Sequence, residues 1–163
     1  MDTKKEVIRV NGKLKEVITV FDKTGKILHK TITPLMVEFY PRDIMQVIIG
    51  ATILAIPVAF TEETWNLGSS LPLLNILGVL LMALFFISIF VYYNFYRGHF
   101  KGQIDEFFKR VLSTYFFSFL VVAVLLTLIQ RAPWATDWLL AVKRTVLVSF
   151  PASMSAAVSD MIK

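Results

Sequence analysis

Four apolar runs of near-membrane length follow one another in this 163-residue chain. They are Ile44–Phe60, Leu71–Tyr96, Val111–Ile129 and Trp138–Val158. A bilayer core about 30 Å thick is crossed by about 20 apolar helical residues, and no soluble domain of this size needs four such runs. The sequence therefore predicts an all-α membrane protein, a four-helix transmembrane bundle over residues 41–163. Its expected spans are 44–66, 71–96, 111–129 and 138–159.

The charges are distributed unevenly along the chain. Nine of the 17 Lys and Arg residues precede Ile44, and the formal net charge is +5. An excess of cations before the first span is what the positive-inside rule describes, so we expect a lipid bilayer rather than nucleic acid as the partner. The first apolar run follows a long charged segment and does not read as a cleavable signal peptide. The chain has no Cys, which excludes disulfides and Cys metal ligands, and no cofactor is expected.

Residues 1–40 are predicted to form a small N-terminal β-meander on the cytoplasmic side. Alternating, β-branched segments at Glu6–Val10, Leu14–Phe21 and Lys26–Thr33 read as three strands. Asn11-Gly12 is a strong hairpin signal, and Asp22–Gly25 forms the next turn.

A three-stranded sheet of this length is marginal by itself. We therefore expect it to pack on the bundle, on a neighbouring subunit, on another protein or on anionic headgroups. A solvated tether is the simpler alternative. The two histidines, His29 and His99, lie in polar segments and are expected to be ordinary exposed side chains rather than metal ligands.

The loops between the spans predict an orientation. Thr61–Ser70 carries two acids and no Lys or Arg, whereas Arg97–Arg110 carries four cations. This bias places the N-terminus, the 97–110 loop and Lys163 inside, and the first loop outside. Aromatic side chains mark the expected membrane interfaces: Tyr40, Trp65, Tyr92, Tyr93, Tyr96, Trp134 and Trp138.

Small residues and prolines distinguish the first and fourth spans from the bulky second and third. Ala51, Ala55 and Ala59 repeat every four residues, a spacing that lets helices approach closely. Pro57 removes a helical N–H, so a bend there should face protein or a wet cavity. In the fourth span, Ala152 and Ala156 continue a stretch of small and hydroxyl residues that begins near Pro151.

Lys143 and Arg144 lie near the outer end of the fourth span. Either the helix is full length and the two cations snorkel outward, or the region up to Arg144 lies in the interface and the segment after it is short. We favour the full-length helix. The two cations could also pair with Glu63 or bind an anionic substrate.

A polar route between the first and fourth spans is the sharpest functional hypothesis. Glu62, Glu63 and Asp137 would form an outer carboxylate cluster that attracts cations, as acidic rings do in channels. Oxygen ligands below it would come from Thr52, Ser149 and Ser153, because hard cations prefer oxygen. The simpler interpretation is that the small residues pack helices and that the two glutamates lie in water at a helix end.

The second half of the chain resembles a family of uncharacterised prokaryotic multi-pass membrane proteins known only as a domain of unknown function. The resemblance rests on Phe60–Trp65 after the first span, Arg110–Tyr115 at the third, and Pro151-Ala152-Ser153 in the fourth. It covers about residues 41–160 and implies a bacterial or archaeal inner-membrane protein. It brings no activity and therefore no catalytic residue.

These observations predict an oligomeric small-ion channel or transporter, with a cation favoured as the ion. The alternative is a membrane scaffold that recruits a partner through the β segment. No phosphate loop, His-Glu metal motif or G-x-S-x-G is present, so we do not expect an enzyme.

Overall fold

The computed structural model describes residues 2–11, 13–22, 25–34, 38–97, 100 and 103–162. The chain divides into two compact units, Met1–Glu38 and Phe39–Lys163, which are described separately. Gly12, Lys23, Thr24, His99, Lys101 and Lys163, which enter the predictions above, lie outside the described residues.

The first unit is an antiparallel sheet of three strands in chain order, β1 (Asp2–Val10), β2 (Lys13–Phe21) and β3 (Ile27–Pro34). The meander expected from the sequence is therefore present. Asn11 has a positive φ of 52°, as a tight hairpin turn requires, and Gly25 has a φ of 78° in the second turn. A register shift at Val20/Phe21 interrupts the β2–β3 ladder.

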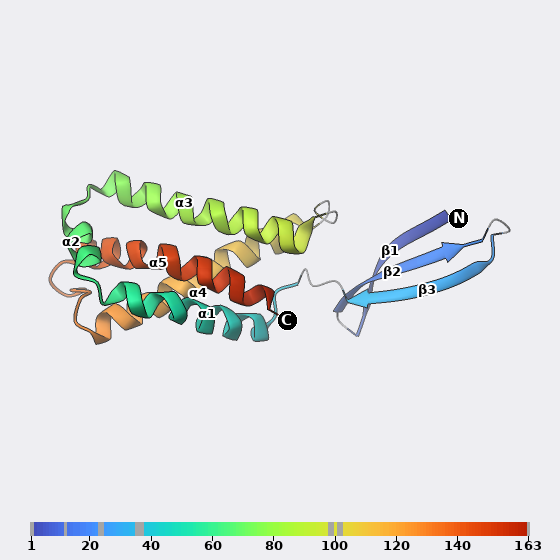
Figure 1. The fold of residues 1–163 in the computed structure, drawn as a ribbon, viewed down its shortest axis with the longest axis horizontal. Coiled ribbons are helices and arrows are strands. Elements are labelled where there is room, and N and C mark those ends of the chain that lie inside the picture. Colours follow the sequence, from blue (N-terminus) through green and yellow to red (C-terminus); the bar gives the residue numbers. More distant parts are fainter. Residues whose placement is uncertain are drawn as a thin grey trace. The chain divides into compact units, whose positions relative to one another are not determined.

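The second unit is helical (Figure 1). Its elements are α1 (Pro41–Ala59), α2 (Glu62–Ser70), α3 (Leu73–Val91), the short π-helix η1 (Tyr92–Tyr96), α4 (Ile104–Leu128) and α5 (Trp138–Met161). Pro41 begins α1, where a missing N–H costs nothing. The Asp43 carboxylate accepts a hydrogen bond from the Tyr40 backbone N–H (3.0 Å) and so caps the same end.

Within the described part of the chain, three helices are long and apolar enough to cross a membrane: Pro41–Ala59, Leu73–Tyr96 and Ile104–Leu128. The prediction of four spans is not confirmed, because α5 is not among them. Its 24 residues are long enough, but charged, small and hydroxyl residues lower its hydropathy. The packing shows why α5 can carry such residues. In α5 ten residues are buried, whereas in α3 only four are. The reason is that α5 lies between α1, α3 and α4 (Figure 1). A helix surrounded by protein can carry small and polar residues that a lipid-facing helix cannot.

Two boundaries differ from those expected. The first span ends at Ala59 rather than near residue 66, and the expected loop 61–70 is the separate helix α2. Glu62 and Glu63 in its first turn favour this start, because carboxylates stabilise a helix N-terminus. Similarly, α4 begins at Ile104, with Asp105 and Glu106 in its first turn, rather than at Val111.

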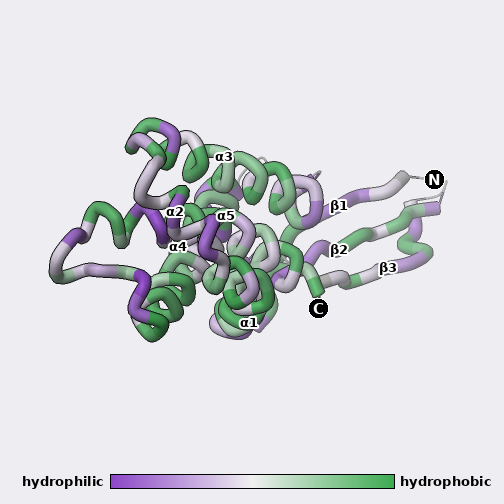
Figure 2. The backbone as a smooth tube through the Cα atoms, turned by 60° about the vertical axis from the view of Figure 1, so that its left-hand side comes forward, coloured by the Kyte–Doolittle hydropathy of each residue, from purple (hydrophilic) through white to green (hydrophobic). Residues whose placement is uncertain are grey.

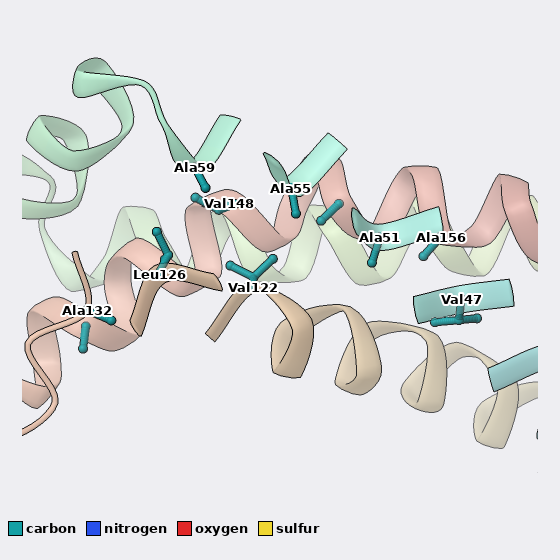
Figure 3. Close-up of a cluster of buried hydrophobic side chains, with 11 residues drawn as sticks. Val47, Ala51, Ala55, Ala59, Val122, Leu126, Ala132, Val148 and Ala156 are labelled. Atoms are coloured by element: carbon teal, nitrogen blue, oxygen red, sulfur yellow. The ribbon is translucent and has the colours of Figure 1, made fainter. Parts of the chain in front are cut away.

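Alanines form the contact between α1 and α5. Ala51, Ala55 and Ala59 have no exposed surface and lie in one core cluster with Ala152 and Ala156 (Figure 3). The remaining members come from α1, α4, α5 and the 132 turn: Val47, Val122, Leu126, Ala132, Ala141 and Val148. The residues of α3 are by contrast hydrophobic along most of its length (Figure 2), and many of its large apolar side chains are exposed.

Candidate functional site: a buried ionic cluster

Arg110 is the largest side chain with no exposed surface in the described part of the chain. It lies in the second turn of α4, a position that the sequence predicts to be cytoplasmic loop. Its guanidinium donates to Asp160 in the last turn of α5 (Nη1–Oδ2 2.6 Å). The other side of the guanidinium faces Asp43 of α1 (Nη2–Oδ2 3.5 Å). Both carboxylates are buried, so three helices meet at one ionic cluster.

Aromatic rings enclose the guanidinium on its remaining faces. The Arg110 Cζ atom lies 3.9 Å from the centre of the Phe95 ring and 5.4 Å from that of Phe39. Phe95 belongs to η1, whose next residue, Tyr96, is fully buried and packs edge-on against Phe107 at 5.4 Å. Short π-helices are frequent at functional sites, and this one turns two aromatic side chains toward the cluster. The ring faces favour a desolvated cation.

The electrostatics of the cluster explain why a buried arginine is tolerated. Burying an isolated charge is expensive, whereas a charge held by hydrogen-bonded counter-ions is accepted. Asp43 is further stabilised at the N-terminus of α1. Asp160 lies near the C-terminus of α5, where an anion is unfavourable, and the 2.6 Å ion pair with Arg110 offsets this. Glu106, one turn before Arg110, is bound instead to the exposed Lys109 at 3.6 Å.

A buried polar stripe continues from the cluster along the facing sides of α4 and α5. Arg110, Thr114 and Ser118 follow one another every four residues on α4, and all three have no exposed surface. On α5, Ser153 and Ser149 lie seven and eleven residues before Asp160 and therefore on nearly the same face of the helix. The hydroxyls of Ser118 and Ser153 donate to carbonyls of their own helices. Those of Thr114 and Ser149 have no partner among the described residues.

The outer carboxylates do not converge on this stripe. Glu62 and Glu63 are exposed at the start of α2, and neither forms an ion pair within the described part of the chain. Asp137 caps α5 by accepting from the Leu140 N–H (2.9 Å). The Thr52 hydroxyl donates to the Ile48 carbonyl of its own helix (2.8 Å) and faces an open apolar groove on the outside of α1. The structure thus does not bring Thr52 together with Ser149 and Ser153, which are buried in α5.

Lys143 and Arg144 bind backbone carbonyls rather than Glu63. The Lys143 ammonium donates to Leu71 at the end of α2 (2.5 Å). Arg144 donates to the carbonyls of Trp65 (3.2 Å) and Arg131 (2.9 Å). The two cations therefore tie α2 and the α4–α5 connection to α5, and no anionic partner is needed to explain them.

The prolines have different surroundings. Pro57 is exposed in the last turn of α1. Pro151 lies within α5, half-buried, directly before the buried Ala152.

Sequence reasoning misses the three charged residues of the cluster. It assigns Arg110 to a loop, and it gives Asp43 and Asp160 no part in the expected ion route. One signal in the sequence could have indicated this polar face. Arg110, Thr114 and Ser118 recur every four residues in a segment whose other residues are mostly bulky and apolar.

The apolar helices, the buried charge and the core of small residues define an integral membrane helical bundle with an N-terminal sheet. Residues 19–162 match the family model DUF2391, described as "putative integral membrane protein", and the chain belongs to this family of unknown function. The match begins within β2, so the family region includes β3, which the resemblance from sequence leaves out. No curated protein matches the chain. No solved structure matches it either.

Proposed function

We propose that this protein transports a small cation across a prokaryotic inner membrane, and that the Asp43–Arg110–Asp160 cluster with its polar stripe is the cation-handling element. One observation carries the proposal: two carboxylates and one guanidinium are fully buried where α1, α4 and α5 meet. Ionisable side chains inside a membrane protein are costly, and they commonly mark ion or proton pathways. The stripe leads from this cluster into the bundle.

The location of the route follows from the packing. The buried alanines at the α1–α5 contact offer no side-chain oxygen to an ion. The α4–α5 face offers hydroxyl oxygens, among them those of Thr114 and Ser149, which have no partner within the described residues. Oxygen atoms can coordinate hard metal cations, and they can also hold the water molecules that carry protons. The full burial of the stripe favours a transporter that opens transiently over a permanently open channel.

The exposed Glu62, Glu63 and Asp137 have a lesser place in this proposal. Glu62 follows the end of α1, whereas Asp43 stands at its beginning, so the two lie at opposite ends of that helix. We propose that the outer acids only raise the local cation concentration. A homo-oligomer, a cytoplasmic N-terminus and the absence of enzymatic chemistry belong to the same proposal.

Ser149→Ala is the sharpest test of the stripe, with Ser88→Ala in α3 as the matched control. Ser88 donates to its own helix (2.7 Å) and lies outside the stripe. Removing a buried hydroxyl that has no partner should leave stability unchanged or raise it slightly. Purified protein in liposomes should therefore show cation flux, read by pH- and metal-sensitive dyes, that falls about tenfold in Ser149→Ala without loss of thermal stability.

Two outcomes would overturn the proposal. One is the absence of flux for protons and several metal cations in wild-type protein that is folded and correctly inserted. The other is equal flux in wild type, Ser149→Ala and Ser88→Ala. Glu63→Gln provides a second comparison and should reduce flux less than Ser149→Ala does.

A recruiting role for the β segment is the second candidate. It is favoured by the outer edges of β1 and β3, which pair with no other strand among the described residues and can accept a further strand. Deleting residues 1–33 should then abolish co-purification of a partner while the bundle remains folded. A truncated bundle with full activity and unchanged partners would remove this candidate.

A further inference from the structure

The strand register divides the side chains of the sheet between two faces. Residues paired directly across strands share a face, which places Lys4 beside Thr19 and Thr19 beside Lys30. The next rows on the same face are Glu6–Val17–Ile32 and Ile8–Lys15–Pro34. We call this the lysine face, because Lys4, Lys15 and Lys30 surround its apolar centre.

The lysine face combines exposed apolar groups with cations. Ile8 is 38% exposed and Ile32 is 51% exposed. On the opposite face of β1 and β2, Val7 is the one large apolar side chain that is exposed, among the residues whose side chains are described. On the lysine face, Ile8 and Ile32 are therefore exposed apolar side chains that lie among cations.

By register, two acids, Asp2 and Glu6, share this face with the three lysines, and they do not cancel its positive charge. Glu6 is held by Lys4 at 2.6 Å. The hydrogen bond from Lys4 and its positive charge lower the pKa of Glu6, so this pair remains ionised and locally neutral. Lys15 and Lys30 have no ion pair among the described residues and lie on two neighbouring strands. These two lysines therefore leave the face with a net positive charge.

Chain connectivity keeps the sheet close to the membrane. Six residues lie between Pro34, the last residue of β3, and Pro41, the first residue of α1, so seven Cα–Cα steps join them. A chain of that length extends at most about 25 Å. The sheet is thus held near the headgroups at the membrane surface where α1 begins, at a high effective concentration. A surface of lysines around isoleucines suits this layer, because lysine stems cover apolar contacts while their ammonium groups reach phosphates.

We propose that the lysine face of the N-terminal sheet docks onto the headgroups of anionic lipids at the membrane surface from which α1 enters. Lys15 and Lys30 bind lipid phosphates, and Ile8 and Ile32 enter the boundary between headgroups and acyl chains. This docking is independent of the cation route between α4 and α5, and it supplies the packing partner that a three-stranded sheet needs.

Hydrogen exchange of the full-length protein in nanodiscs tests the docking. Amides of β1, β2 and β3 should exchange about tenfold more slowly in nanodiscs that contain phosphatidylglycerol than in nanodiscs of phosphatidylcholine alone. High salt should remove the difference, because it screens the lysine–phosphate attraction.

The variant Lys15→Gln/Lys30→Gln should lose the anionic-lipid protection. The control Lys5→Gln/Lys26→Gln removes the same charge outside the lysine face and should keep most of it. Equal protection in both lipids would mean that the bundle, a second copy or nothing covers this face, and would overturn the proposal. So would equal loss in both double variants. Cation flux of the lysine-face variant should stay unchanged, so the two proposals can fail separately.

Discussion

Arg110 shows how a single residue can decide where the polar interior of a membrane bundle lies. Its position in the second turn of α4 would be costly in lipid, yet the structure surrounds it with Asp43, Asp160 and the Phe95 ring. Each partner comes from a different helix or from η1. The arginine is therefore both a structural tie between helix ends and the most unusual charge in the described part of the protein.

Removal of the arginine should be strongly destabilising because it leaves two buried carboxylates without their cation. We expect Arg110→Gln to lower the free energy of unfolding by about 3–5 kcal/mol, measured by denaturant unfolding in detergent. Asp160→Asn in that background should recover part of the loss. The recovery with Asp43→Asn should be smaller, because its carboxylate lies at 3.5 Å rather than 2.6 Å. A loss below about 1 kcal/mol would show that the cluster contributes little to stability.

At the scale of elements, α5 is the centre of the bundle and α1 is its closest neighbour. The approach depends on small side chains, most clearly at Gly50. A Cβ at this position would lie 2.9 Å from both the Ala156 Cα and the Ser155 carbonyl oxygen, and it would also meet the Ser159 Cβ. Backbone atoms cannot move aside cheaply, so only glycine allows this contact.

The pair Gly50→Ala and Gly78→Ala isolates this packing effect. Gly50→Ala should destabilise the protein by about 1–3 kcal/mol through overpacking of α1 against α5. A methyl group at Gly78 in α3 would meet nothing within 4 Å, so alanine there should stabilise the protein by up to about 1 kcal/mol through helix propensity. Thermal unfolding of both variants in the same detergent provides the measurement. Similar shifts in both would mean that α1 and α5 do not pack this closely in the membrane.

At the scale of the whole molecule, the beginning of α1 and the end of α5 lie side by side, so the two helices run antiparallel. The Gln46 side-chain amide donates to the Ile162 carbonyl (2.7 Å), which puts the C-terminal end of α5 beside the beginning of α1. If α1 enters the membrane from the cytoplasm, the end of α5 should lie on the same side.

The absence of Cys permits a direct test of this topology by single-cysteine labelling. Exposed cysteines at Asn66→Cys and Thr136→Cys should react with an impermeant maleimide on intact cells. Thr3→Cys should react only after the membrane is opened, because cations dominate the N-terminal segment. Ile162→Cys should behave in the same way, because the end of α5 lies beside the beginning of α1. Labelling of Ile162→Cys on intact cells while Thr3→Cys stays protected would show that α5 does not return to the side of the N-terminus.

The elements are easier to predict than their environment. The alternation of β1 to β3 and the apolar length of α3 follow from local pattern, and both are anticipated within a few residues. The predicted start of α4 is wrong by seven residues, because the charged run before Val111 reads as a loop when its partners are unknown. Arg110 finds those partners 50 and 67 residues away in the chain, a distance that no local pattern records.

The sequence by itself determined that most of this chain belongs in a membrane, that a small sheet precedes the helices, and that small residues collect in α1 and α5. Each of these follows from composition and periodicity, which act locally along the chain. Only the tertiary structure decided that α5 is enclosed by its neighbours, that α1 meets it through alanines, and that the polar groups gather between α4 and α5 around Arg110. The reason is that the cost of a buried charge depends on which distant side chains surround it.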